Sequence, residues 1–124
     1  MSQRRWVAPV LWAGVIEVLT SWPNPPSVAA PAGTDKVVHL VLYATFGLLT
    51  MRSVWSGRFV RRTALFVAGG VAIFAALDEW HQLFIPGRSM ELGDWIADFV
   101  GALAGIALYS LMARARFARR ESKP

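Results

Sequence analysis

The sequence predicts an all-α membrane protein, a bundle of four transmembrane helices with both chain ends in the cytoplasm. First, 55% of the 124 residues are hydrophobic and only 17% are charged, and the mean hydropathy of +0.41 is far above that of an ordinary soluble domain. Second, four apolar runs each approach the roughly 20 residues that cross a bilayer as a helix. Third, the basic residues concentrate before the first run, around the second connection and after the fourth run, which is one side of the predicted bundle. One domain spanning 1–124 is expected.

Helix-breaking segments separate the four runs. They are the proline-rich stretch from 23 to 35, "SGR" at 56–58 and "IPGRSMELGD" at 85–94. Length and all-round apolar character define the spans, because no helical periodicity stands out. The predicted helices cover about 6–22, 37–55, 63–84 and 95–112, and a basic cytoplasmic tail follows at 113–124.

Lysines and arginines set the predicted orientation, since they are enriched on cytoplasmic flanks. Eleven of the thirteen precede the first run, surround the second connection or follow the fourth run. Only Lys36 and Arg88 fall on the opposite side. The first and third connections are therefore expected outside the cytoplasm.

An alternative makes the first run a cleaved secretory signal. Arg4 and Arg5 precede it, and "SVAA" at 27–30 resembles a cleavage site. The run is long for a signal and contains Glu17, which favours a retained helix.

Composition excludes several classes of function. The chain has no cysteine, so disulfides, thiolate zinc sites and cysteine nucleophiles are ruled out. The net charge of +5 is explained by membrane flanks, and no nucleic-acid partner is expected. There is no phosphate-binding glycine loop and no glycine-framed serine nucleophile.

The acids gather at the predicted outer helix ends. A charged side chain in hydrocarbon costs about 2.5 kcal/mol or more, so these groups are expected to face one another inside the bundle. Residues four apart share a helix face, and three such pairs occur: Asp35 with His39, Asp78 with Gln82, and Asp94 with Asp98. On the fourth helix this face continues as Gly101 and Gly105, which allow a close approach of another helix.

The cluster suggests three chemistries. An acid or histidine could act as general acid or base on a lipid-linked substrate, Lys36 and Arg88 could hold a phosphate, or the excess carboxylates could bind a positively charged or metal-bridged ligand. The candidate catalytic residues are Asp35, His39, Asp78 and Glu79, the candidate ligand-binding residues are Lys36, Gln82, Arg88, Asp94 and Asp98, and the helix-packing residues are Gly101 and Gly105. No metal site is predicted, because His39 and His81 fit interfacial histidines better.

Three blocks resemble the VanZ-like family of small bacterial membrane proteins, named after a protein associated with resistance to the glycopeptide teicoplanin. They are "TDKVVHLVLYATFGLL" at 34–49, "LDEWHQLFIPGRS" at 77–89 and "GDWIADFVGALAGI" at 93–106. Family members often have asparagine where this chain has Asp98, so the resemblance does not make that charge indispensable. It implies an envelope-related role in the bacterial cytoplasmic membrane and no particular reaction.

The expected function is binding or modification of a cell-envelope molecule at an extracytoplasmic polar pocket. That molecule would be a cell-wall precursor, a lipid-linked glycan or a glycopeptide antibiotic target. The main alternative is a non-catalytic module, in which the polar cluster only holds the bundle together or docks a partner. Proton or cation movement is a third possibility. The expected partners are the lipid bilayer and a lipid-linked envelope substrate; the sequence points to no particular cofactor or oligomeric state.

Overall fold

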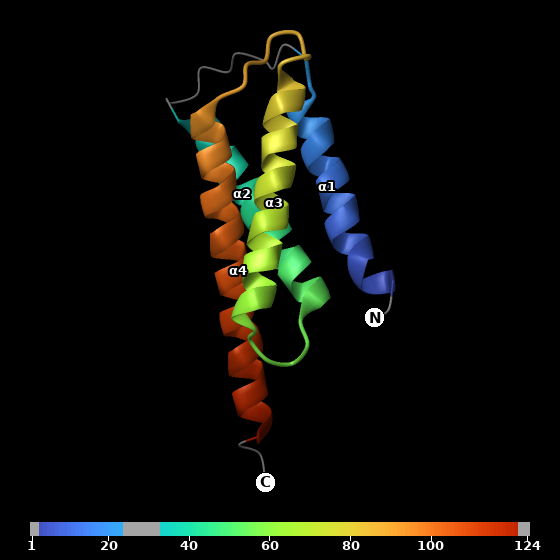
Figure 1. Ribbon diagram of the computed structural model, residues 1–124, viewed down its shortest axis with the longest axis vertical. Helices are drawn as coiled ribbons and strands as arrows, with labels where there is room; N and C mark the ends of the chain where they lie inside the picture. The colour runs from blue at the N-terminus through green and yellow to red at the C-terminus, as the bar shows by residue number, and fades with distance from the viewer. Residues whose placement is uncertain (1–2, 24–32, 122–124) are drawn as a thin grey trace.

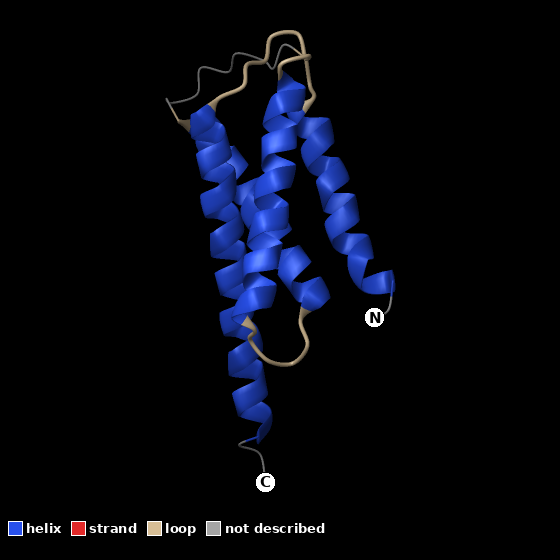
Figure 2. Cartoon of the chain, in the orientation of Figure 1, coloured by secondary structure: helices blue, strands red, loops and turns tan. Residues whose placement is uncertain are grey.

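The computed structural model describes residues 3–23 and 33–121, and these parts are entirely helices and their connections (Figures 1 and 2). A short 3-10 helix, η1 (Gln3–Trp6), leads into α1 (Val7–Thr20), and α2 (Thr34–Val54), α3 (Arg61–Gln82) and α4 (Leu92–Glu121) follow. The all-helical prediction is confirmed. The cleavage site considered at 27–30 lies outside the described residues.

Successive helices run in alternating directions, so the bundle has two distinct ends (Figure 1). We call the end where α1 and α3 finish and α2 and α4 begin the acidic end. The opposite end, where α1 and α3 begin and α2 finishes, is the arginine end. The first turn of α1 and the last turns of α4 both lie toward the arginine end (Figure 1).

Three helices, α2, α3 and α4, are long and apolar enough to cross a membrane. Helix α1 has 14 residues, which is about 21 Å of α-helix and short of a hydrocarbon core of about 30 Å. Its α-helical part is thus shorter than the predicted 6–22 span. Four membrane crossings therefore remain a prediction.

Helix α4 extends further than the sequence predicts. It continues to Glu121 through the stretch 113–121, which the membrane-span criterion assigns to the tail. The reason is local, since "ARARFARRE" is rich in alanine and arginine, which favour helix, and contains no glycine or proline. Arginines near the C-terminus also suit the negative end of the helix dipole.

The bundle has an apolar exterior and a polar interior at its acidic end. On α3, Phe66, Ile73 and Leu77 are 67%, 65% and 56% exposed, whereas Asp78 and Glu79 are fully buried. In a soluble protein the apolar side chains would be buried and the acids exposed. The arrangement on α3 is the opposite and suits a bilayer, because hydrocarbon solvates apolar side chains and excludes charged ones.

Helices α2 and α4 form the most extensive helix pair in the bundle. A side chain at Gly101 would overlap the carbonyl of Leu40, and one at Gly105 would overlap the carbonyl of Ala44. Gly47 makes the reciprocal close approach from α2. These glycines allow the two backbones to approach closely, as small residues do between membrane helices. They therefore determine the register of α4 against α2.

Candidate functional site

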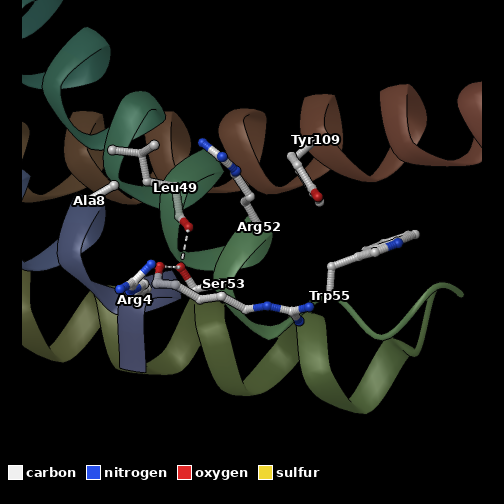
Figure 3. A pocket seen from close by; sticks show the side chains of 8 residues that line it. Arg4, Ala8, Leu49, Arg52, Ser53, Trp55 and Tyr109 are labelled. Carbon is white, nitrogen blue, oxygen red and sulfur yellow. Dashed lines mark hydrogen bonds between the residues drawn. The ribbon is translucent and has the colours of Figure 1, made fainter. Parts of the chain in front are cut away.

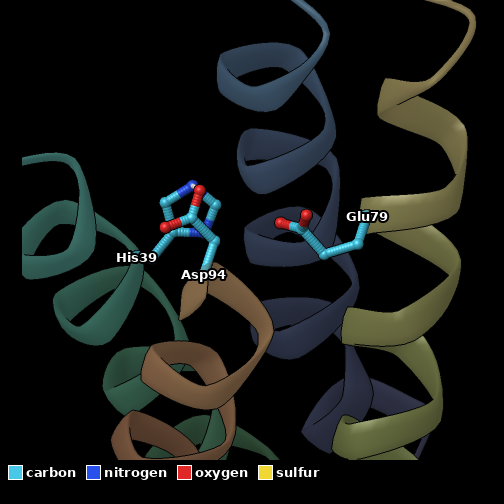
Figure 4. A group of neighbouring side chains, drawn as sticks. All are labelled: His39, Glu79 and Asp94. Atoms are coloured by element: carbon cyan, nitrogen blue, oxygen red, sulfur yellow. Dashed lines mark ion pairs between the residues drawn. The ribbon is translucent and has the colours of Figure 1, made fainter. Parts of the chain in front are cut away.

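Buried ionisable side chains from three helices meet at the acidic end. His39 comes from α2, Glu79 from α3 and Asp94 from α4 (Figure 4). Asp98 follows Asp94 by one turn of α4. Their exposed fractions are 6%, 0%, 7% and 0%. Together with Lys36 on the first turn of α2, we call these residues the acidic cluster.

His39 is the centre of the acidic cluster. Its Nδ1 lies 2.9 Å from Asp98 Oδ1, a hydrogen-bond distance, and its Nε2 lies 4.0 Å from Asp94 Oδ2. The second carboxylate oxygen of Asp98 is buried and has no hydrogen-bond partner among the described residues. Asp98 thus orients the imidazole, and Nε2 is the ring atom left for other chemistry.

Lys36 neutralises the rim of the acidic cluster. Its Nζ lies 2.8 Å from Asp94 Oδ1, 3.1 Å from Asp35 Oδ2 and 3.2 Å from Glu91 Oε2. One ammonium group is therefore shared by three carboxylates. Asp35 and Glu91 are exposed, so these two pairs are screened by solvent, whereas the buried Asp94 is held more firmly.

Glu79 ties the connection between α3 and α4 to the bundle. Its Oε1 accepts a hydrogen bond of 3.2 Å from Gln82 Nε2, and its Oε2 accepts one of 3.0 Å from the backbone N–H of Glu91. In Figure 4 the Glu79 carboxylate points toward His39 and Asp94. Gln82, a predicted ligand-binding residue, therefore reaches the acidic cluster only through Glu79.

Asp78 belongs to a different network. Thr20 Oγ1 donates to its Oδ1 at 2.7 Å, and Tyr43 Oη donates to its Oδ2 at 2.9 Å. This buried carboxylate joins α1, α2 and α3. Sequence reasoning missed Thr20 and Tyr43; Tyr43 could have been found, because it lies one helical turn after His39 on the same face.

Arg88 does not reach the acidic cluster. Its Nη2 donates to the Leu19 carbonyl at 3.0 Å, and its Nε donates to the Trp22 carbonyl at 3.3 Å. The guanidinium group therefore caps the C-terminus of α1, where carbonyls lack intrahelical partners and a cation is favourable. His81 is also apart, with Nδ1 3.6 Å from Glu17 Oε2.

The geometry brings together a possible set of metal ligands, although the sequence predicts none. One ligand atom each from His39, Glu79 and Asp94 lies within 4.8 Å of the others, and a more exposed trio of Asp35, Glu91 and Asp94 satisfies the same condition. One imidazole nitrogen with two carboxylate oxygens is a donor set that divalent transition metals accept.

A comparison with family models identifies the family of the chain. The family model described as VanZ/LLP1 matches residues 4–113, a range that includes α1, α2, α3, α4 as far as residue 113, and every member of the acidic cluster. Neither a comparison with curated proteins nor one with solved structures yields a match. With three helices suited to crossing a bilayer, the chain is a membrane protein that belongs to the VanZ-like family.

Proposed function

We propose that the acidic cluster binds or modifies a cell-envelope molecule at the outer face of the bacterial cytoplasmic membrane. The observation that supports this most is the burial of His39, Glu79, Asp94 and Asp98 from three separate helices at one end of the bundle. Burying several ionisable groups is costly in any protein, and in membrane proteins such groups usually mark a site of binding or chemistry.

The charges of the acidic cluster favour a ligand that brings positive charge. Three carboxylates, those of Glu79, Asp94 and Asp98, face one lysine and one histidine. A divalent cation on His39, Glu79 and Asp94 would balance this charge and could in turn bind the phosphate of a lipid-linked precursor. Without a cation, the Asp98-oriented imidazole would serve as a general base toward a substrate hydroxyl or water.

The proposal includes four membrane crossings with both chain ends in the cytoplasm. Helix α1 and the preceding η1 together extend about 29 Å, close to the hydrocarbon thickness of about 30 Å. The arginine distribution puts the acidic end outside, where a cell-wall precursor, a lipid-linked glycan or a glycopeptide target would be met. No nucleic-acid partner is proposed.

The test compares two histidine variants. His39→Gln removes the imidazole from the acidic cluster, whereas His81→Gln changes a half-exposed histidine paired with Glu17. Each protein is purified with native membrane lipids, and the co-purified lipid-linked envelope molecules are quantified by mass spectrometry. We expect His39→Gln to lower their recovery about tenfold, a binding loss of about 1.4 kcal/mol, and His81→Gln to leave it within about twofold.

Thermal unfolding in detergent provides the necessary control. The proposal requires His39→Gln to lose the bound molecules while unfolding within a few degrees of the wild type. If no envelope molecule co-purifies with the wild type above the level found with an unrelated membrane protein, the proposal is wrong. A chelator added during purification distinguishes a ligand bound through a divalent cation from one bound directly by the imidazole, because it would release only the former.

A second candidate function is purely structural, and one observation favours it. Lys36 already pairs with Asp94, His39 with Asp98, and Glu79 with Gln82 and the backbone of Glu91. The four most buried members of the cluster expose at most 7% of their surface. A ligand would have to displace these contacts. On this hypothesis the polar groups hold the helices together by interhelical hydrogen bonds of about 0.6–2 kcal/mol each, and His39→Gln would lower stability and membrane abundance together.

A further inference from the structure

A second polar site lies at the arginine end, far from the acidic cluster. A pocket of about 410 Å³ opens there between η1, the start of α1, the last turns of α2 and the middle of α4. Arg4, Arg5 and Arg52 line it together with Trp55 and Tyr109. Figure 3 shows Arg4 on one side of this pocket, Arg52 above it, and Trp55 and Tyr109 on the other side.

A tertiary contact holds the backbone that carries Arg4 and Arg5 against α2. Ser53, which is 2% exposed, donates its hydroxyl to the backbone carbonyl of Arg5 at 2.6 Å, with the Leu49 carbonyl a second acceptor at 2.9 Å (Figure 3). This bond fixes η1 against the end of α2. The three guanidinium groups thus come from two segments that are distant in sequence and joined by a buried contact, so the pocket is part of the tertiary structure.

The described residues do not balance the positive charge of this pocket. Among the described residues, Arg4, Arg5 and Arg52 form no ion pair, and no acidic side chain lines the pocket. The nearest acid along α4 is Asp98, eleven positions before Tyr109 and about 16.5 Å away along the helix axis. The three arginines are exposed and form no ion pair with a described residue, so their charge is available to an anionic ligand.

The surroundings select the kind of anion. The rings of Trp55 and Tyr109 pack edge to face with their centroids 5.6 Å apart. Such aromatic side chains are common at the level of the lipid headgroups in membrane proteins. Ala8 and Leu49 add an apolar wall. Guanidinium groups bind phosphate oxygens in pairs of parallel hydrogen bonds, and basic pockets between membrane helices suit lipid headgroups.

We propose that Arg4, Arg5 and Arg52 bind the phosphate group of an anionic phospholipid, with its glycerol and first acyl carbons against Ala8 and Leu49. This site is separate from the acidic cluster and does not depend on the proposed function. It lies at the end that the basic residues predict to be cytoplasmic, where anionic lipid is available to it.

The test measures lipid retention on the full-length protein by native mass spectrometry. The probes are phosphatidylglycerol, cardiolipin and, as a zwitterionic comparison, phosphatidylcholine. We expect the wild type to retain the anionic lipids about tenfold better than phosphatidylcholine, and Arg52→Gln to lose about tenfold of that retention. Arg61→Gln removes the same charge from the same end of the bundle but not from the pocket lining, so it should change retention by less than about twofold.

Three results would overturn the proposal. Equal losses in the Arg52→Gln and Arg61→Gln variants would mean that the whole basic face attracts lipid without a site. Full retention by Arg52→Gln together with Arg4→Gln would remove these arginines from binding. Displacement of the lipid by millimolar inorganic phosphate would show that a free anion is the ligand. Arg52→Lys keeps the positive charge but lacks the planar guanidinium group, so it should retain an amount of anionic lipid between those of the wild type and Arg52→Gln. The same variant is a control for folding, because lysine preserves the apolar part of the side chain.

Discussion

At the residue scale, Asp78 is the most consequential single side chain outside the acidic cluster. The sequence predicts it to be catalytic, but its two oxygens each accept a hydroxyl donor, from Thr20 on one side and Tyr43 on the other. Both donors and the acceptor are buried. A carboxylate that accepts a buried hydrogen bond on each oxygen joins three helices.

This arrangement predicts the effect of removing either hydroxyl. Tyr43→Phe and Thr20→Val should each lower the free energy of unfolding by about 1.5–3 kcal/mol, because each removes a hydrogen bond to a charged acceptor. Thermal or denaturant unfolding in detergent measures the change. Thr45→Val is the matched control, since that hydroxyl donates to the Val41 carbonyl one turn earlier in its own helix and to no other described residue.

The double variant sharpens the test. If both hydroxyls act through Asp78, the effects of Tyr43→Phe and Thr20→Val should not be additive, because the two donors share one acceptor group. Losses no larger than that of Thr45→Val would contradict the hydrogen-bond network described for Asp78.

Residue-level prediction from the sequence had a clear limit. The four-residue spacing of Asp94 and Asp98 placed both on one face of a helix, and the cost of charge in hydrocarbon argued for burial. Neither argument specifies partners on other helices. The sequence therefore could not distinguish the carboxylate near His39 from the one near Thr20, nor show that Arg88 would turn toward the backbone of α1.

At the element scale, the close packing of α2 against α4 determines where the acidic cluster forms. Gly101 and Gly105 lie one and two turns below Asp98, and both face carbonyls of α2. The register that they impose sets His39 beside Asp98 at 2.9 Å. The close backbone contact between α2 and α4 and the pairing of His39 with Asp98 thus both follow from the same register of these two helices.

Enlarging a glycine in this helix pair should separate the helices. Gly105→Val places a side chain on the Ala44 carbonyl, and because backbone cannot move aside as a side chain does, we expect destabilisation of about 3 kcal/mol or more. Gly69→Val is the matched control, because a side chain at Gly69 meets nothing within 4 Å. Equal unfolding temperatures for the two variants would show that the close approach is unimportant.

The helices themselves were largely predictable, and their ends were not. Runs of apolar residues between proline and glycine breakers identified four helices. The same criterion gave no reason for α4 to continue to Glu121, because a membrane-span argument stops where charge begins, whereas helix formation depends on backbone propensity. For α1 the error was opposite, since apolar character extends to Trp22 but the helix ends at Thr20.

At the scale of the whole molecule, charge separates along the bundle axis. Buried carboxylates and histidine occupy the acidic end, and Arg4, Arg5 and Arg52 line a pocket at the other. Such a distribution sets the orientation of a membrane protein through its basic residues. It also gives the two ends opposite charge, with buried carboxylates at one and arginines at the other.

Cysteine labelling tests the orientation directly, because the chain has no cysteine of its own. Single serine-to-cysteine variants at Ser2, Ser56, Ser89 and Ser122 sample both chain ends and two connections. With a membrane-impermeant maleimide on intact cells, only Ser89→Cys should react, and the other three should react after the membrane is opened. Labelling of Ser2→Cys in intact cells would show that α1 does not cross the bilayer.

The hydrogen bond between His39 and Asp98 joins residues 59 positions apart. During synthesis at roughly 5–20 residues per second, about 3–12 s pass between the emergence of the imidazole and that of its carboxylate partner. For that interval α2 and α3 must reside in the translocation machinery or the bilayer with His39 and Glu79 incompletely paired. The final helix therefore completes the assembly as well as the site, and nascent chains truncated before it are expected to be substrates for membrane quality-control proteases.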